Sequence, residues 1–227
     1  MRARLSPLGD HALVATFGDE VEPATNLEVR NFEHRVAEIA PEGWIESVPA
    51  FTTVTLLYDP LRTSYERLAA ALEPLLEEPP MDSEASEPRT IDIPVHYGGE
   101  FGPDLAFVAA HNGLDEKDVV DIHSASEYLV YMIGFAPGFP YLGGMSSRIS
   151  VPRRDSPRSS IPAGTVCIAG RQTGIYPFES PGGWQLIGRT PLRLFRAEDD
   201  PPSLLEAGDR VRFKPIERTE FESMVAG

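Results

Sequence analysis

The segment 77–88, EEPPMDSEASEP, most constrains the fold because the residues on its two sides are patterned differently. It is rich in Pro, Ser and Glu, and Met81 is its one large apolar residue. Such a composition, without helical or strand periodicity, is typical of a solvated linker. We therefore expect an N-terminal domain over residues 1–76, a linker over 77–88 and a second domain over 89–227. A chain of 227 residues is long enough for two modest cores.

The first part mixes strand and helix patterns. A short strand is expected at 14–17, and an apolar stripe that starts after a first-turn proline predicts a helix over 23–40. Residues 48–58 fit one long strand or a strand pair, and the Thr-Ser pair at 63–64 can cap a second amphipathic helix. This order predicts a small α/β sandwich with helices on one face of a sheet.

The second part is richer in turns. Apolar and polar residues alternate over 91–96, as in a half-buried strand, and 104–112 and 115–122 fit short helices. Ten of the 19 glycines then fall between Gly134 and Gly188. Short apolar runs occur there and beyond at 128–133, 161, 166–169, 184–187, 192–195 and 211–213. Frequent short strands between turns predict an all-β barrel or sandwich, so that the whole chain is α+β.

Charge and cysteine content exclude several classes of protein. The net charge of −15 argues against a nucleic-acid-binding surface, and no apolar run approaches the roughly 20 residues of a membrane span. One cysteine excludes an intramolecular disulfide, and the five histidines show no metal-ligand spacing. We therefore expect a cytoplasmic protein without a metal site. The charge is uneven, since residues 1–88 carry −11 whereas 143–193 carry +5.

The segment 131–144, YMIGFAPGFPYLGG, should form a rigid loop because its glycines and prolines restrict the backbone. The loop displays Phe135, Phe139 and Tyr141. These aromatic side chains either plug one end of the barrel or form the wall of a small-molecule pocket.

Arginines concentrate after this loop. Arg154 lies in the proline-punctuated segment VPRRDSPR, and Arg171 lies between Gly170 and Gly174, where backbone amides can approach an anion. The arginines either bind a carboxylate or phosphate through bidentate hydrogen bonds or form an ordinary solvated loop. Neither a GxxxxGK[ST] loop nor a GxGxxG motif after a strand is present, which argues against a self-sufficient nucleotide site.

Two further residues invite a catalytic interpretation. His123 follows a predicted helix and is either a hydrogen-bonded structural residue or a catalyst. Cys167 lies in the apolar run VCIA, which favours a buried thiol. No GxSxG nucleophile motif is present.

Long motifs resemble one family, that of the B component of 5-oxoprolinase, also called the KipI or allophanate hydrolase subunit 1 family. They are LSPLGDHAL, IPVHYGGEFGPDL, GFAPGFPYLGGM and VPRRDSPRSSIPAGTVCIAGRQTGIYPFESPGGWQLIGRTPLRLF. The resemblance covers most of the chain. It implies a small N-terminal α/β domain followed by a cyclophilin-like β-barrel, which agrees with the change of pattern at the linker.

The resemblance implies a subunit of an ATP-dependent 5-oxoprolinase, which opens 5-oxo-L-proline to L-glutamate. Its partners would be a second barrel subunit and a lactam-opening subunit, with which the ATP site is shared. Two alternatives stay open within the family. One is an inhibitor of a sensor histidine kinase, and the other is a carboxyltransferase-like module of urea or allophanate metabolism.

Lactam opening requires anion-binding donors and a proton shuttle. Under the resemblance, His123 is the candidate shuttle, and Arg154 and Arg171 are the candidates that hold a carboxylate or phosphate. Phe139 and Tyr141 would exclude water from the substrate. The candidate hydrogen-bonding residues are Tyr131, Gln172, Thr173 and Gln185.

Overall fold

The computed structural model describes residues 3–77 and 89–226, which fall into two compact units. The expected linker, after Glu77, lies outside the described residues, so the domain limits stay a prediction.

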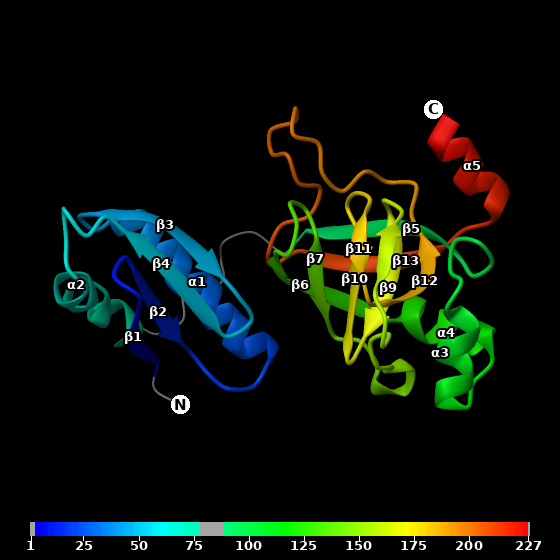
Figure 1. Ribbon diagram of the computed structural model, residues 1–227, viewed down its shortest axis with the longest axis horizontal. Coiled ribbons are helices and arrows are strands. Elements are labelled where there is room, and N and C mark those ends of the chain that lie inside the picture. Colours follow the sequence, from blue (N-terminus) through cyan, green and yellow to red (C-terminus); the bar gives the residue numbers. More distant parts are fainter. Residues whose placement is uncertain (1–2, 78–88, 227) are drawn as a thin grey trace. The chain divides into compact units, whose positions relative to one another are not determined.

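The first unit is built on a four-stranded antiparallel sheet (Figure 1) with the strand order β1-β2-β4-β3. The strands are β1 (Arg4–Leu8), β2 (Ala12–Thr16), β3 (Trp44–Pro49) and β4 (Thr53–Tyr58), and the helices are α1 (Pro23–Ile39) and α2 (Tyr65–Glu77). Both helices pack on one face of the sheet, where Phe32 and Leu72 meet Leu13 and Leu56 in the core. The predicted α/β sandwich is confirmed.

Two details differ from the expectation. Residues 48–58 belong to a strand pair, which is one of the two expected arrangements, but its first strand begins earlier, at Trp44. Strand β1, which contains Pro7, was not among the expected elements. Its place at the edge of the sheet explains how the strand tolerates this proline, which has no N–H to donate.

The second unit is a closed seven-stranded barrel with the order β10-β7-β6-β13-β5-β12-β9, which confirms the predicted barrel and the α+β class. The β13–β5 pair is parallel and the other pairs are antiparallel. The strands are β5 (Thr90–Tyr97), β6 (Glu127–Ile133), β7 (Pro140–Gly143), β9 (Thr165–Ala169), β10 (Gln172–Ile175), β12 (Gln185–Arg189) and β13 (Arg210–Pro215). A separate two-stranded sheet pairs β8 (Arg158–Ile161) with β11 (Ser180–Gly182).

Helices α3 (Leu105–Asn112) and α4 (Glu116–Ala125) lie together beside the barrel (Figure 1). Their side chains Leu105 and Val119 join the main barrel core, in which Val130, Ile168 and Phe213 are fully buried. Asp115 and Asp118, at the two ends of the first turn of α4, form a capping box, which fixes where this helix starts. The remaining elements are the 3-10 turn η1 (Ser147–Ile149) and the helix α5 (Arg218–Ala226).

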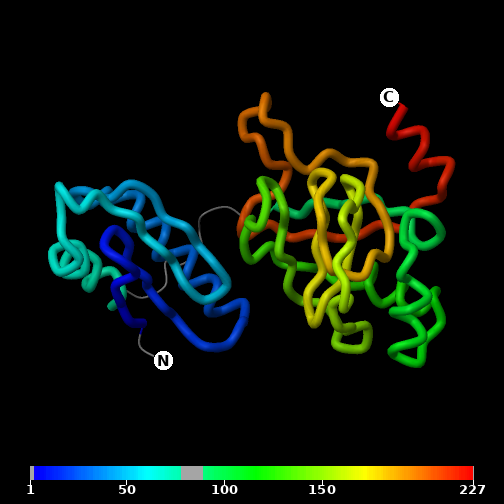
Figure 2. Tube along the Cα trace, viewed as in Figure 1, coloured from blue at the N-terminus to red at the C-terminus, as the bar shows by residue number. Residues whose placement is uncertain are grey.

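One expected strand is absent from the described residues. The apolar run 192–195 lies in the connection between β12 and β13, which Figure 2 shows in orange extending away from the barrel. Leu194 is nevertheless buried, and Phe195 forms only an isolated bridge with Ser203. The run is apolar because it packs on the core, and not because it pairs with a strand. Across residues 3–77 and 89–226, no helix is both long and apolar enough to cross a membrane.

Candidate functional site

Five aromatic side chains gather on the outer side of the barrel and form what we call the aromatic face. Phe139 is at its centre, with ring centroids 5.0 Å from Tyr141, 5.4 Å from Phe135, 5.4 Å from Tyr176 and 5.8 Å from Trp184. The four pairs are edge-to-face, which is a favourable arrangement for aromatic rings. The Gly/Pro-rich loop therefore contributes to a wall and does not plug the barrel interior.

Alternation along the strands creates this face. In β9, Val166 and Ile168 point into the barrel core, whereas Cys167 and Ala169 belong to the cluster beneath the aromatic face. In β10, a Cβ atom at Gly174 would lie 2.9 Å from the Phe139 ring. Only glycine therefore allows the ring to pack this closely against the strand. Cys167 is fully buried and its thiol donates to the Gly174 carbonyl, as a structural thiol would.

Burial raises the pKa of the Cys167 thiol well above its ordinary value, so the thiol is protonated at neutral pH. Burial also raises the pKa of the Tyr141 hydroxyl. Neither group is therefore a nucleophile poised near neutral pH. In the aromatic face Phe139, Tyr176 and Trp184 are buried, so Phe135 and Tyr141 are the rings that remain accessible to a ligand.

Arg153 brings positive charge to the aromatic face. Its guanidinium carbon lies 5.7 Å from the centroid of the Trp184 ring, within the range of a cation–π contact. Its charge also reaches the hydroxyls of Tyr141 and Tyr176, where it partly offsets the rise in pKa that burial causes. The exposed Arg153 side chain is thus held next to the rings and faces solvent.

A buried carboxylate anchors the neighbouring arginines. Asp104 accepts hydrogen bonds from the backbone N–H of Leu186 at 2.7 Å, from Arg158 Nη2 at 2.8 Å and from Arg154 Nη1 at 3.4 Å. The carboxylate thereby connects residues 151–158, which we call the arginine loop, to α3 and β12. Arg158 Nη1 is buried and has no acceptor among the described residues. A guanidinium nitrogen in this state favours an added acceptor, such as an anion or water.

His123 lies on the other side of the same strands, inside the barrel. Its ring is fully buried and lies 4.4 Å, centroid to centroid, from that of Phe213. Nε2 lies 3.0 Å from Thr173 Oγ1, and Nδ1 lies 2.8 Å from the Tyr97 hydroxyl. The Thr173 hydroxyl donates to the Cys167 carbonyl, so its oxygen can only accept from His123. The neutral ring therefore carries its proton on Nε2 and accepts from Tyr97 at Nδ1.

Burial lowers the pKa of His123 to about 3, so the ring is neutral at neutral pH. Both ring nitrogens are already bonded within the barrel. This geometry favours a structural role, in which His123 fixes Thr173 and with it the β9–β10 hairpin. A proton-shuttle role stays a prediction, and it would require opening of the barrel interior.

The other predicted site residues are dispersed. Arg171 is exposed at the turn between β9 and β10, next to the half-buried Gln172. Gln185 is buried and donates through Nε2 to the Pro152 carbonyl, which holds the start of the arginine loop. Tyr131 is buried on β6 with its ring against Gly143. The structure thus brings Phe139 and Tyr141 together with the arginine loop, and separates them from His123 and Thr173.

Sequence reasoning overlooked three residues that organise this region. Trp184 and Tyr176 complete the aromatic face, and Asp104 orients the arginines. The signals were a tryptophan after two glycines and an aspartate just before a helix. Neither signal alone indicates which distant loop the side chain meets.

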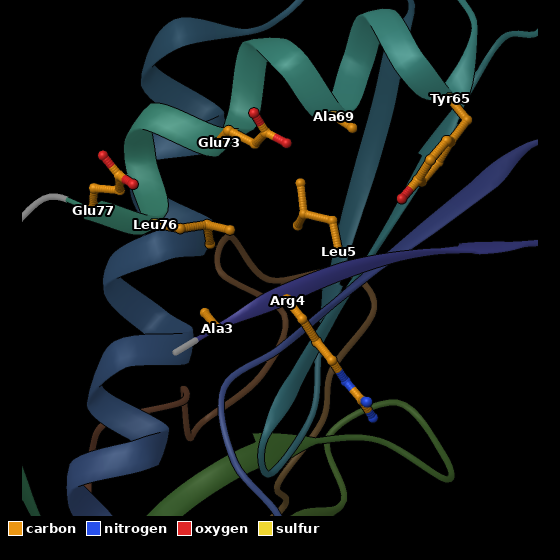
Figure 3. A pocket seen from close by; sticks show the side chains of 8 residues that line it. All are labelled: Ala3, Arg4, Leu5, Tyr65, Ala69, Glu73, Leu76 and Glu77. Carbon is orange, nitrogen blue, oxygen red and sulfur yellow. The ribbon is translucent and has the colours of Figure 1, made fainter. Parts of the chain in front are cut away.

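The structure also contains two hollows away from the aromatic face. One, of about 390 Å³, lies in the first unit between β1 and α2, and Figure 3 shows Leu5, Tyr65 and Glu73 around it. The other, of about 580 Å³, lies in the second unit, where Arg189 bonds the Ala163 carbonyl and Arg193 pairs with Glu198. Among the described residues no three His, Cys, Asp or Glu side chains are grouped to hold a metal ion. We take the aromatic face with its arginines as the candidate site because it combines clustered aromatic rings with a guanidinium held beside them.

Comparison with known proteins gives similarities over nearly the whole chain. The family described as carboxyltransferase domain, subdomain C and D, matches residues 3–205. The B component of 5-oxoprolinase from Bacillus subtilis is 47% identical, over 98% of this chain and 97% of that protein. The protein of the same name from Escherichia coli O157:H7 is 46% identical, over 94% of this chain and 96% of that protein.

Solved structures show the same architecture. The crystal structure of TTHA0988 matches with a TM-score of 0.81 at 36% identity and covers 92% of this chain. This chain spans only 40% of that longer one. The K. lactis urea amidolyase matches with a TM-score of 0.82 over 99% of this chain and 15% of its own. At 22% identity, that likeness supports the fold alone.

Proposed function

The chain belongs to the family of carboxyltransferase domains, subdomain C and D, and within it to the B components of 5-oxoprolinase, and from this membership we propose that it is one subunit of an ATP-dependent 5-oxoprolinase. The complex would open 5-oxo-L-proline to L-glutamate in the cytoplasm. The observation in the structure that carries the proposal is the aromatic face with Arg153 over Trp184, next to Arg154, whose guanidinium pairs with Asp104. Both arginines lie in the segment 143–193, which carries +5 in an acidic chain.

The arrangement suits a small planar anion. A lactam carboxylate presents a flat amide to the rings and a carboxylate to a guanidinium, which forms strong charge-assisted hydrogen bonds. We assign carboxylate binding to Arg153 and Arg154, and water exclusion to Phe139, Tyr141 and Trp184.

ATP, when bound in the complex, would supply a phosphoryl group to the lactam oxygen with release of ADP. Water would then add to the activated carbon, the bond to the ring nitrogen would break and phosphate would leave. The sequence of this chain has neither a GxxxxGK[ST] loop nor a GxGxxG motif after a strand. We therefore propose that ATP binds at a site shared with the partner subunits, and that this chain is inactive alone. Those partners would be a second barrel subunit and a lactam-opening subunit.

We propose positioning roles for the residues that lie away from the aromatic face. His123 and Thr173 would hold the β9–β10 hairpin from inside the barrel, and Gln185 would hold the arginine loop. Arg171 and Gln172, at the end of the hairpin, would meet the substrate or a partner subunit. Tyr131 would support β7 through Gly143.

The test is reconstitution of the complex with purified subunits. ATP-dependent glutamate formation from 5-oxoproline should require this chain, and Arg154→Gln should raise KM for 5-oxoproline by about tenfold. Arg193→Gln is the matched control, since Arg193 lies in the same cationic segment but pairs loosely with Glu198 at 3.9 Å. If omission of this chain leaves turnover unchanged, the proposed function is wrong.

The same preparation tests the two alternatives from the family. A histidine-kinase inhibitor would lower autophosphorylation of a sensor kinase and would not require Arg154. A urea-linked carboxyltransferase module would consume carboxylated biotin with urea and not with 5-oxoproline.

A further inference from the structure

Phe135 occupies an unusual position in the turn between β6 and β7. Its backbone is in the left-handed region, with φ at +66°, and the residue is 62% exposed. Residues other than glycine adopt this conformation at a cost of about 1 kcal/mol or more. A bulky aromatic residue therefore stands where glycine would be less strained.

The turn gives Phe135 little freedom to relax. The Gly134 N–H donates to the Phe139 carbonyl at 3.0 Å, and the Phe139 N–H donates to the Ala136 carbonyl at 3.0 Å. Pro137 restricts the backbone further. These bonds hold the turn closed, so the left-handed backbone belongs to a well-defined turn.

The contacts of Phe135 within the protein offset little of this backbone strain. The Phe135 ring makes edge-to-face contacts with Phe139, at 5.4 Å, and with Tyr176, at 6.3 Å. Most of the ring still faces solvent. A strained backbone combined with an exposed aromatic ring at the border of the candidate site points to a ligand and not to stability.

We propose that Phe135 is a ligand-contacting residue whose exposed ring stacks on a planar, anionic small molecule held at the aromatic face. This inference rests on the proposed function, under which the molecule is 5-oxoproline and the stacked group is its lactam amide. The ring is anchored along its edge by Phe139 and Tyr176, which leaves area free for such a contact. The cation over Trp184 belongs to the same aromatic face and accounts for the preferred negative charge.

The test uses Phe135→Gly, which removes the ring and relieves the backbone, and Phe135→Tyr, which keeps the ring. In the reconstituted complex we expect Phe135→Gly to raise KM for 5-oxoproline roughly three- to tenfold, as loss of one stacking contact would. The value of kcat should stay within about twofold. Phe135→Tyr should keep the wild-type KM. The melting temperature of Phe135→Gly should equal or exceed that of the wild type, because glycine accepts a positive φ.

Phe107→Ala is the matched control, because Phe107 is also an exposed phenylalanine of the second unit and lies on α3. It should change neither KM nor kcat. An unchanged KM in Phe135→Gly overturns the inference, although the proposed function survives if omission of the chain still abolishes turnover. Loss of co-elution with the partner subunits in Phe135→Gly also overturns it, since the ring would then contact a protein.

Discussion

The inner and outer faces of the β9–β10 hairpin differ in charge and in the side chains that pack against them. The inner face carries Thr173, bonded to the neutral and fully buried His123. The outer face carries Cys167 and Gly174, above which Phe139 and the other rings collect under a guanidinium. Because successive side chains of a strand alternate between faces, two adjacent positions serve the core and the candidate site. Variants of the inner face should therefore change stability, and variants of the outer face should change ligand binding.

The largest effect should come from the inner face. His123→Ala leaves Thr173 and Tyr97 without their shared partner and opens a cavity beside Phe213. We expect the free energy of unfolding to fall by about 3 kcal/mol, measured by urea denaturation. If the variant keeps wild-type stability but loses turnover in the complex, His123 is the proton shuttle after all and the division between the two faces fails.

Lowering the pH should test the role of His123 on the inner face without a mutation, because it changes the free energy of unfolding. The pKa of His123 is about 3 in the folded chain, against 6.5 for an unperturbed histidine, so the unfolded state binds the extra proton between these values. The contribution of the neutral ring is complete above pH 6.5 and decreases as the pH falls. At pH 5 the loss should be about 2 kcal/mol. The measurement is the difference in unfolding free energy between pH 7 and pH 5, which should be smaller by this amount in His123→Gln.

Several features of the fold were predictable because they depend on local pattern. Apolar runs located β6, β9 and the centre of β12, and helical spacing located α1, α3 and α4. The apolar run 192–195 was wrongly predicted to be a strand, because burial on a core and pairing in a sheet select the same apolar residues. Strands β10 and β11 carried too few apolar residues to stand out between their glycines.

The candidate site was predictable only in its parts. The aromatic loop and the arginine segment were visible as motifs, and a buried Cys167 was expected and is confirmed. That Thr173 faces inward while Gly174 faces outward depends on strand register, which the neighbouring strands decide. The separation of His123 from Phe139 and Tyr141 likewise arises from long-range packing, which no local spacing encodes.

A methyl group on the outer face tests how closely the aromatic face packs. In Gly174→Ala the new Cβ would lie 2.9 Å from the Phe139 ring and 3.1 Å from the Pro140 carbonyl, so the strand or the ring must shift. We expect a loss of about 1–2 kcal/mol in unfolding free energy and weaker binding of 5-oxoproline by the complex. The control is Gly183→Ala, whose Cβ would meet its nearest neighbour at 3.7 Å. Equal losses in the two variants would show that the region is sensitive to any added methyl group.

Arg153→Gln should have the smallest effect on stability and still disturb the outer face. The exposed guanidinium contributes one cation–π contact with Trp184, so its removal should cost about 0.5 kcal/mol in unfolding free energy. If Arg153 also binds the ligand carboxylate, KM for 5-oxoproline should rise severalfold while kcat changes little. Arg153→Lys keeps the charge without the planar guanidinium and should restore only part of the affinity. A rise in KM without a matching loss of stability would distinguish this face from the interior, where stability is the quantity that changes first.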